Sequence, residues 1–286
     1  MSNPVPRSAE GSPAAAVPVY DSSRRRPRWV EEAAHLWRYR GLVHELVIRD
    51  IKVRYKRSVL GLLWTMLAPL LNMIALTLVF SALLKTTISN YPVYFMAGQI
   101  FWSFFAQTTN GAASQTQASN DLAKRMFVPR SVFVAAAVGG GLVNLFLSLL
   151  PLVLILAVTG FRFYATWAFL PVSIFILTIF TTGVALLLFT LTSRFADVRE
   201  MYGVIVQTWF FLTPIVYEPS IVPFRYRVWL SLNPMYHLIQ VFRKPIYEGV
   251  LPSVELIVVS LALSIAVLAT GWVYFCHRTD KMAYWS

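Results

Sequence analysis

Long stretches without a charged residue limit this chain to few kinds of fold. No Asp, Glu, Lys or Arg occurs within residues 58–84, 86–120, 131–161, 163–193, 201–217 or 256–276. A helix needs about 20 apolar residues to cross a bilayer, so every run except the marginal one at 201–217 is long enough. Charged residues make up only 13% of the chain, whereas soluble proteins carry about 25%. The sequence therefore predicts an all-α integral membrane protein with six transmembrane helices.

The distribution of positive charge predicts how these helices are oriented. We place the spans at about 58–84, 91–115, 131–160, 165–193, 201–217 and 255–276. The flanking segments hold 19 Lys and Arg residues on the side of the two termini and 6 on the other side. Positive residues favour the cytoplasmic side. We therefore expect a multi-pass protein of the cytoplasmic (inner) membrane, in contact with the lipid bilayer, with both termini in the cytoplasm.

The second uncharged run is too long for one span and changes character along its length. Polar side chains become frequent after Gln107. Two interpretations follow. Either the inner half of this run faces other helices or water, or the span stops near Gly111.

Two regions precede the first span. Residues 1–28 are rich in Pro, Ser and Ala and end in a run of arginines, which predicts a disordered cytoplasmic tail. Residues 29–57 place apolar side chains at a helical spacing opposite charged ones, which predicts an amphipathic helix at the inner membrane surface. Residues 58–286 then form the six-span transmembrane domain.

Prolines divide the segment between the fifth and sixth predicted spans. Residues 218–250 contain apolar pieces too short to cross a bilayer, and Pro219, Pro223, Pro234 and Pro245 interrupt them. Broken helices at membrane depth are tolerated only where they pack on protein or line a cavity. We therefore expect two short re-entrant helices that dip into the membrane from the outer side and serve a permeation path.

Aromatic residues are concentrated in this part of the chain. Between Met201 and Tyr247, 11 of 47 residues are aromatic, a higher share than the 15% of the whole chain. Tyr and Trp rings combine an apolar face with a polar tip, so they can stack on sugars without holding one repeat unit firmly. An interfacial aromatic belt and ordinary helix packing are the alternative explanations. The candidate residues of a substrate path and outer gate are Trp64, Trp102, Trp209, Phe210, Phe211, Tyr217, Phe224, Tyr226, Trp229 and Tyr236.

The sequence offers few groups for catalysis or metal binding. The 4 histidines are scattered, the lone cysteine is Cys276, and no Gly-Lys pair of a phosphate-binding loop occurs. We therefore expect no catalytic residue, no metal site and no cofactor in this chain, and do not predict it to be an enzyme. The net charge of +12 does not indicate nucleic-acid binding, because the basic residues flank apolar runs rather than forming one face.

The segment 121–130 is the one substantial cytoplasmic loop between predicted spans. It is short and basic, and Phe127 is flanked by charged residues. Such a loop is typical both of a docking element for a soluble partner and of a plain positive anchor at the membrane surface. The loop by itself favours neither role.

A longer motif carries a family resemblance. Residues 49–64, RDIKVRYKRSVLGLLW, followed by Pro69-Leu70, resemble the start of the first span in permease subunits of ABC-type polysaccharide exporters, which move O-antigen, teichoic acid, capsule or galactan chains. Further stretches agree with this family in order and spacing, namely residues 124–130, 194–199, 212–217 and 232–234. The likeness covers about residues 36–280, although Ala196 stands where that loop more often carries a charge.

The resemblance implies a function and a set of partners. It implies a permease subunit that exports a lipid-linked polysaccharide across the cytoplasmic membrane, together with a dimer of a separate P-loop ATPase. Because one bundle is narrow for a glycan, we expect a homodimer with the path at its interface. ATP and Mg would bind in the partner ATPase. The residues implied in ATPase coupling are Arg49, Asp50, Lys52, Arg54, Lys124, Arg125, Phe127, Pro129 and Arg130.

Two other functions are compatible with parts of the sequence. An ABC permease of the same architecture can export a small amphipathic drug or lipid. A membrane enzyme of lipid-linked glycan assembly would instead need an acidic cluster near a membrane face. Asp197 and Glu200 are the pair available for that role in an intracellular loop.

Overall fold

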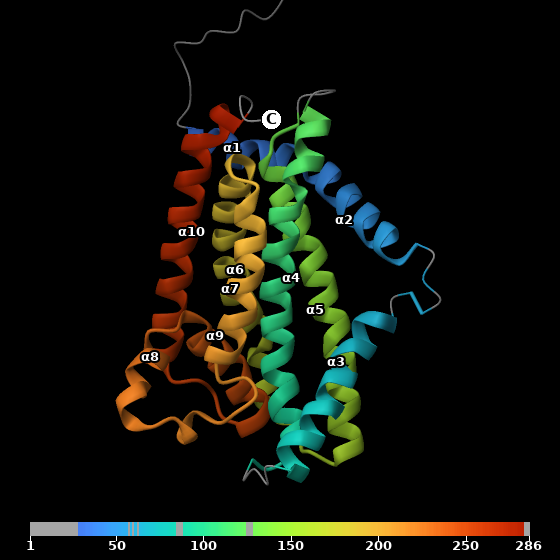
Figure 1. Cartoon of the computed structure of the whole chain (residues 1–286), viewed down its shortest axis with the longest axis vertical. Coiled ribbons are helices and arrows are strands. Elements are labelled where there is room, and N and C mark those ends of the chain that lie inside the picture. Colours follow the sequence, from blue (N-terminus) through green and yellow to red (C-terminus); the bar gives the residue numbers. More distant parts are fainter. Residues whose placement is uncertain are drawn as a thin grey trace, which may run out of the picture.

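The computed structural model describes residues 28–56, 58, 60–61, 63–83, 88–123 and 128–282, and these residues form helices with no β-strand among them. The long helices lie side by side in a bundle (Figure 1). The all-α class is thereby confirmed for this part of the chain. The predicted tail, apart from Arg28, lies outside the described residues, as do Lys124, Arg125 and Phe127 of the predicted coupling loop.

Four helical runs are long and apolar enough to cross a membrane: Leu63–Phe80, Ser131–Thr159, Ala165–Arg194 and Val254–Thr279. The first consists of α3 (Leu63–Thr77) and the start of the π-helical η2 (Leu78–Leu83). The others are α5 (Ser131–Thr159), then α6 (Leu170–Arg194) with the 3-10 helix η3 (Ala165–Phe169) before it, and α10 (Val254–Met282). The long uncharged stretches of the sequence thus become the long helices of the bundle.

Two further helices lie along these spans. α4 (Tyr91–Ala123) contacts α5 and α6, and α7 (Asp197–Leu212) contacts α4 and α6 (Figure 1). α4 continues through Gly111, so the helix does not stop there. Thr108 and Thr109 in its polar half are buried, and the Tyr202 hydroxyl of α7 donates a hydrogen bond to Thr109 at 2.8 Å. Part of the polar half of α4 therefore faces neighbouring helices, whereas Gln107 and Ser114 in it are exposed.

Two helices occupy the segment before the first span. α1 (Arg28–Arg38) and α2 (Arg40–Tyr55) meet at Tyr39, whose φ of −95° and ψ of 18° interrupt the helix. α1 lies at one end of the bundle and contacts α5 and α10, whereas α2 contacts α5 and slants away from the bundle axis (Figure 1). Leu46 of α2 is buried in a hydrophobic cluster that includes Val132 and Phe133 of α5. The apolar side of α2 thus packs on protein.

Short helical pieces connect α7 to α10 at the opposite end of the bundle (Figure 1). They are η4 (Pro219–Ile221), η5 (Phe224–Tyr226), α8 (Arg227–Ser231), α9 (Pro234–Arg243) and the π-helical η6 (Lys244–Glu248). Asn233 caps α9 by accepting a hydrogen bond from the Met235 backbone nitrogen at 3.0 Å. Met235, Leu238 and Phe242 of α9 are buried, and this helix contacts α4, α6 and α10.

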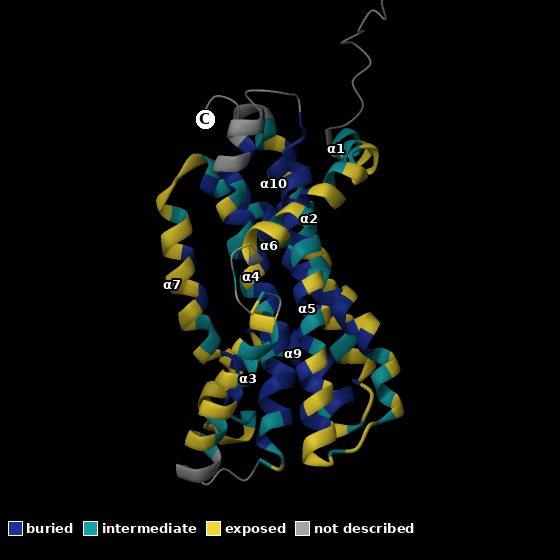
Figure 2. Cartoon of the chain, turned by 90° about the vertical axis from the view of Figure 1, so that its right-hand side faces the viewer, coloured by how far each residue is buried: buried dark blue, intermediate teal, exposed yellow. Residues whose placement is uncertain are grey.

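Burial is unevenly distributed over the helices. Figure 2 shows buried residues gathered in the interior of the bundle, while α7 and much of α3 carry exposed residues. Among the described residues of α3, Met73 is buried, whereas Leu71 and Ile74 are exposed. Val204 and Ile205 of α7 are exposed as well. α3 and α7 therefore present apolar side chains that lipid or another protein chain would cover.

Glycines allow α6 and α10 to approach each other closely in the core. A Cβ atom placed on Gly183 would lie 2.6 Å from the backbone nitrogen of Leu268. One placed on Gly271 would overlap the carbonyl oxygen of Gly183. Small residues allow backbones to approach in this way in membrane bundles.

The substitution Gly183→Ala should destabilise the protein, because its methyl group would force α6 away from α10. Overpacking of this kind costs about 1–3 kcal/mol. We expect a lower thermal midpoint in detergent, measured by heating followed by size-exclusion chromatography. Gly203→Ala on α7 is the matched control, since no heavy atom lies within 4 Å of a Cβ built there. Equal midpoints for the two variants would contradict the packing argument.

Candidate substrate path and coupling surface

Side chains of α4 and α9 hold the chain where it leaves α7. The carbonyl groups of residues 214–217 follow the last turn of α7 and have no helical partner, so they need other donors. Arg243 donates from Nη1 and Nη2 to the first two of these carbonyls at 2.8 and 3.3 Å. The hydroxyls of Tyr91 and Tyr94 donate to the last two, each at 2.9 Å. We call Tyr91, Tyr94 and Arg243 the outer clamp.

The guanidinium of Arg243 is enclosed by the protein. The residue is 1% exposed, and its Cζ atom lies 3.9 Å from the centre of the Tyr94 ring, a cation–π geometry. Gly98 of α4 makes room for it, because a Cβ there would overlap the Arg243 guanidinium. The ring and the carbonyl dipoles together compensate the buried charge.

A second set of hydrogen bonds joins α7 to the start of α9. The Trp209 indole Nε1 donates to Asn233 Oδ1 at 3.0 Å, and Asn233 Nδ2 donates to Thr213 Oγ1 at 2.9 Å. The Thr213 hydroxyl in turn donates to the Trp209 carbonyl at 2.9 Å. The same Asn233 oxygen caps α9, so the orientations of the two helices are linked through one amide.

The structure divides the ten predicted path aromatics into three groups, and the first packs between helices. Trp102 is buried, and its ring centroid lies 5.9 Å from that of Trp209 and 5.6 Å from that of Phe210. Tyr217 is half-buried, and its hydroxyl donates to the Phe211 carbonyl at 3.2 Å. Phe210, Trp209 and Trp102 thus form an edge-to-face cluster that packs α4 against α7.

The second group is exposed on the outer connection and the end of α7. Phe211 is 65% exposed, Phe224 85% and Trp229 71%. Tyr226 is exposed too, with the Arg225 guanidinium 4.6 Å from its ring centre. These four side chains, together with Trp64 at 47% exposed, are the predicted aromatics that are open to a substrate or another chain.

The two remaining predicted aromatics border cavities. Trp64 of α3 lines a cavity of about 320 Å³ together with Arg54, Gln107 and Asn144. Tyr236 of α9 lines a cavity of about 730 Å³ at the outer end of the bundle, which we call the outer cavity. Both cavities have polar groups next to an aromatic ring, a combination that suits carbohydrate more than an apolar drug.

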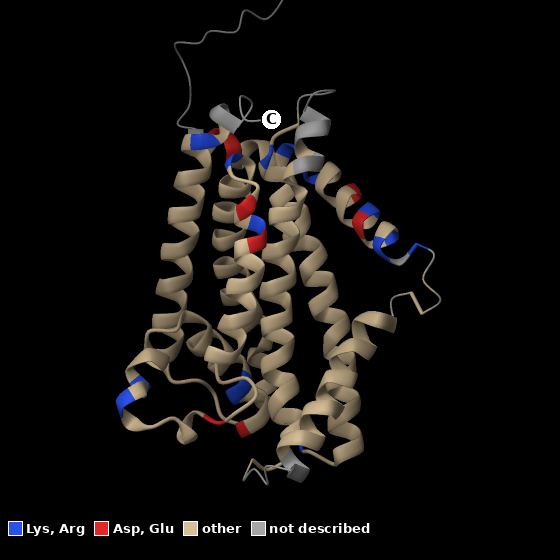
Figure 3. Cartoon of the chain, viewed as in Figure 1, with Lys and Arg blue, Asp and Glu red and all other residues tan. Residues whose placement is uncertain are grey.

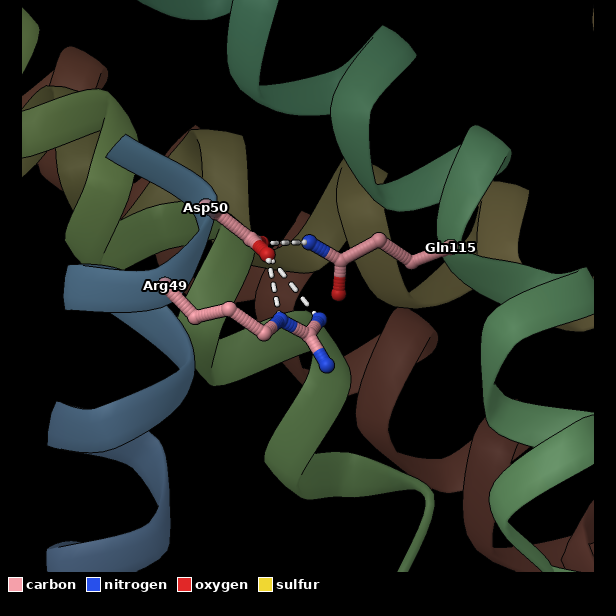
Figure 4. Close-up of polar contacts among 3 residues, drawn as sticks. All are labelled: Arg49, Asp50 and Gln115. Carbon is pink, nitrogen blue, oxygen red and sulfur yellow. Dashed lines mark hydrogen bonds and ion pairs between the residues drawn. The ribbon is translucent and has the colours of Figure 1, made fainter. Parts of the chain in front are cut away.

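The predicted coupling residues Arg49 and Asp50 meet α4 at one point. Gln115 Nε2 of α4 donates to Asp50 Oδ2 at 2.8 Å, and Arg49 Nη2 lies 2.9 Å from Asp50 Oδ1 (Figure 4). This arrangement ties α2 to the inner half of α4. A force applied to α2 would reach α4 through this carboxylate, in addition to reaching α5 through the side chains packed around Leu46.

The other described coupling residues differ in their accessibility. Lys52 is exposed and borders a surface hollow on α2 with Glu45. Pro129 and Arg130 are buried before the start of α5. Burial lowers the pKa of the Arg130 guanidinium from its usual value, but an arginine stays charged at neutral pH. Arg54, also exposed, reaches the cavity that contains Trp64.

Charged residues lie at the two ends of the structure. Figure 3 shows Lys, Arg, Asp and Glu on α1, α2 and the adjoining helix ends, with a second set on the outer connection. The long helical segments between these ends are largely free of charge (Figure 3). This division is typical of a protein that crosses a bilayer.

A family model described as "ABC-2 type transporter" matches residues 42–247. The chain belongs to the ABC-2 type transporter family. The matched region begins in α2 and ends in η6, so it contains the hydrogen bond between Asp50 and Gln115, the outer clamp and all ten predicted path aromatics.

Curated relatives of this ABC-2 family chain cover most of its length. The chain is 32% identical to the O-antigen export system permease protein RfbA of Myxococcus xanthus. The alignment covers 87% of this chain and 96% of the relative. The chain is 28% identical, over 71% of its length and 79% of the relative, to a protein of the same name from Klebsiella pneumoniae. It is 24% identical, over 72% of its length and 81% of the relative, to the polysialic acid transport protein KpsM of Escherichia coli.

Several residues that hold helices together in this ABC-2 family protein were not predicted from its sequence. Arg243, Tyr91 and Tyr94 form the outer clamp, and Gln115 binds Asp50. A weak signal existed for Arg243, which is a charged residue inside a largely apolar outer segment. The Asn-Pro pair before α9 is a recognisable helix start. It pointed to Asn233 as a cap but not to its contact with Trp209.

Removing clamp donors should destabilise the outer region in a graded way. Arg243→Leu leaves two buried carbonyls without donors and Tyr94→Phe leaves one, and each unsatisfied group costs about 1–3 kcal/mol. We expect faster proteolysis of residues 218–232 in detergent, with the larger effect for Arg243→Leu. Tyr226→Phe, which removes the hydroxyl of an exposed tyrosine, is the control and should be cleaved like the unmodified protein. The reverse order of sensitivities would show that the clamp does not hold this segment.

Proposed function

We propose that the chain is the membrane-spanning permease subunit of an ABC exporter that moves a lipid-linked polysaccharide across the cytoplasmic membrane. The observation that carries this proposal is the similarity, over most of the chain, to proteins named as O-antigen export and polysialic acid transport components. The exposed aromatics and polar cavities support it, because sugars combine apolar faces with hydroxyl groups. A separate P-loop ATPase dimer, which the family implies, provides the energy and binds ATP and Mg.

The topology in this proposal has six spans. α4 and α7 join the four apolar runs as the second and fifth spans, since both lie along the bundle and α4 is 33 residues long. The excess of Lys and Arg near the termini supports a cytoplasmic location for both ends. α8 and α9 are then the two re-entrant outer helices. Burial of one face of α9 against α4 and α6 supports this role.

The path is formed between two copies of the chain. α3 and α7 carry the exposed apolar side chains that a second copy would cover, and a two-fold homodimer pairs the same face of each copy. In this arrangement Phe211, Phe224 and Trp229 meet the glycan, while the packed Trp102 and Trp209 support the wall behind them. Weak contacts with exposed rings suit a polymer that has to slide.

Coupling runs from the ATPase through α2. Closure of the ATPase dimer moves α2, and the hydrogen bond between Asp50 and Gln115 transmits this motion to α4. The segment around Pro129 and Arg130 provides the second contact region, together with Lys124, Arg125 and Phe127. α4 then moves α7, because Tyr202 is bonded to Thr109.

The function is tested by deleting the gene for this chain and by purifying the tagged protein in mild detergent. We expect the lipid-linked glycan to accumulate inside the cells, and a P-loop ATPase to accompany the protein in stoichiometric amount. Normal export of every surface glycan would overturn the proposal. Stimulation of the purified ATPase by hydrophobic drugs, without a response to glycan, would favour the drug or lipid exporter. A solitary chain with glycosyl-transfer activity would favour the membrane enzyme.

The exposed aromatics should matter for export but not for assembly. Replacing Phe211, Phe224 and Trp229 together by Ala should reduce glycan export by about tenfold, since each ring contact contributes about 0.5–1.5 kcal/mol. Surface glycan is measured on intact cells, and assembly is measured by co-purification of the ATPase. Phe175→Ala on α6 removes an aromatic residue that is also exposed, at 63%, and should leave export unchanged. Equal export by all variants would show that these rings do not contact the glycan during export.

Breaking the hydrogen bond between Asp50 of α2 and Gln115 of α4 should lower the amount of glycan exported for each ATP hydrolysed. Gln115→Leu removes a hydrogen bond to a charged group, which contributes about 1.5–3 kcal/mol. We expect roughly tenfold less glycan exported per ATP hydrolysed, with the complex still assembled. Ser114→Ala, at the neighbouring exposed position of α4, should preserve the ratio. A preserved ratio in Gln115→Leu would show that α2 acts through other contacts.

A further inference from the structure

We propose that the outer cavity is a binding site for neutral sugar residues of the exported glycan. The proposal rests on the proposed function and deepens it, because it assigns a holding site on the outer side. The cavity has a volume of about 730 Å³, within the range of about 300–1,000 Å³ found for small-ligand sites. Its walls come from α4, α9, η6 and the first turns of α10, together with Ser89 and the start of η4. It therefore lies where the elements of the outer clamp meet.

Two buried polar atoms in the cavity wall have no partner among the described residues. They are Oε1 of Gln240 and Nε of Arg243. Both residues line the outer cavity, and Arg243 is almost completely buried. Buried polar atoms in proteins nearly always have a hydrogen-bond partner. One is an acceptor and the other a donor, which is the pair that sugar hydroxyl groups satisfy, since each hydroxyl both donates and accepts.

The charges around the cavity favour a neutral ligand. Three carboxylates and two basic side chains line it, namely Glu218, Glu248, Glu255, Arg243 and Lys244. An anionic ligand would meet the carboxylates, and a cationic ligand would meet the basic groups. A neutral polyhydroxylated ligand instead finds an acceptor or a donor at each of these groups.

Aromatic rings supply the apolar part of the site. Tyr94, Tyr236 and Tyr247 all line the cavity. Tyr247 packs edge-on against Tyr94 with centroids 5.3 Å apart and stacks on Phe161 at 5.7 Å, and its hydroxyl is bonded to Ser89. Tyr94 is held by its hydrogen bond to the Tyr217 carbonyl. These walls are therefore fixed before a ligand arrives, which lowers the entropic cost of binding.

The position of the site suggests its use in transport. Arg243 belongs both to the cavity wall and to the outer clamp. A sugar bound in the cavity beside Arg243 would hold the emerging chain next to the end of α7. Such a site opposes backward movement of the glycan while the ATPase resets.

The site is tested with the complete complex of permease and ATPase in detergent. The probe is the glycan released from the lipid-linked polysaccharide of the same cells by mild acid, freed of lipid and labelled at its reducing end. Gln240→Leu and Glu248→Gln should each raise the Kd for this probe by about five- to tenfold, the effect expected for one lost hydrogen bond. Glu200→Gln is the matched control for the carboxylate change, because Glu200 is exposed at the other end of α7. It should bind within about twofold of the unmodified complex.

Export is measured on the same variants so that the two proposals are tested separately. A complex that exports the glycan, but whose affinity for the probe is unchanged by both cavity variants, would overturn the sugar site and leave the exporter intact. A complex that exports no glycan would overturn both. Binding that weakens steeply between low and high salt would contradict a neutral ligand, because salt screens contacts between charges.

Discussion

The carbonyl groups at the outer end of α7 impose the constraint on which the outer half of this protein depends. A chain that leaves a helix inside or beside a membrane exposes acceptors that water does not satisfy. Here Arg243, Tyr91 and Tyr94 supply the donors for residues 214–217. The position of α9 is consistent with this requirement, because α9 packs on α4 and its last residue, Arg243, reaches the first two of these carbonyls. The capping amide of Asn233 then fixes the start of the same helix.

Burial divides the molecule into a densely packed side and a sparsely packed side. α4, α5, α6, α9 and α10 share most of the buried side chains, and the glycines of α6 and α10 bring their backbones together. α3 and α7 lie at the margin, with exposed apolar residues. A transport protein needs such a division, since its moving parts must have fewer contacts than the frame that holds them.

The helices were largely predictable because a segment that crosses a bilayer must be long, apolar and hydrogen-bonded within itself. The uncharged run at 131–161 became α5 at Ser131–Thr159, and the prolines after Tyr217 broke the chain into short pieces. The functional surface was less predictable. Trp102 and Trp229 are alike as residues, but only contacts with distant helices make the first buried and the second exposed. The partner of Asp50 lies 65 residues away in the sequence, and no local spacing points to it.

The neutral partner of Asp50 affects how easily α2 can move. A lysine or arginine on α4 would form an ion pair whose separation at a partly buried site leaves an unpaired charge on each helix. Gln115 leaves only an amide, and Arg49 on α2 stays beside the carboxylate. Separation of the two helices therefore costs roughly one hydrogen bond to a charged group, about 1.5–3 kcal/mol. At that strength the contact is closed nearly all the time, so a displacement of α2 is passed on to α4, and the contact re-forms readily if it opens.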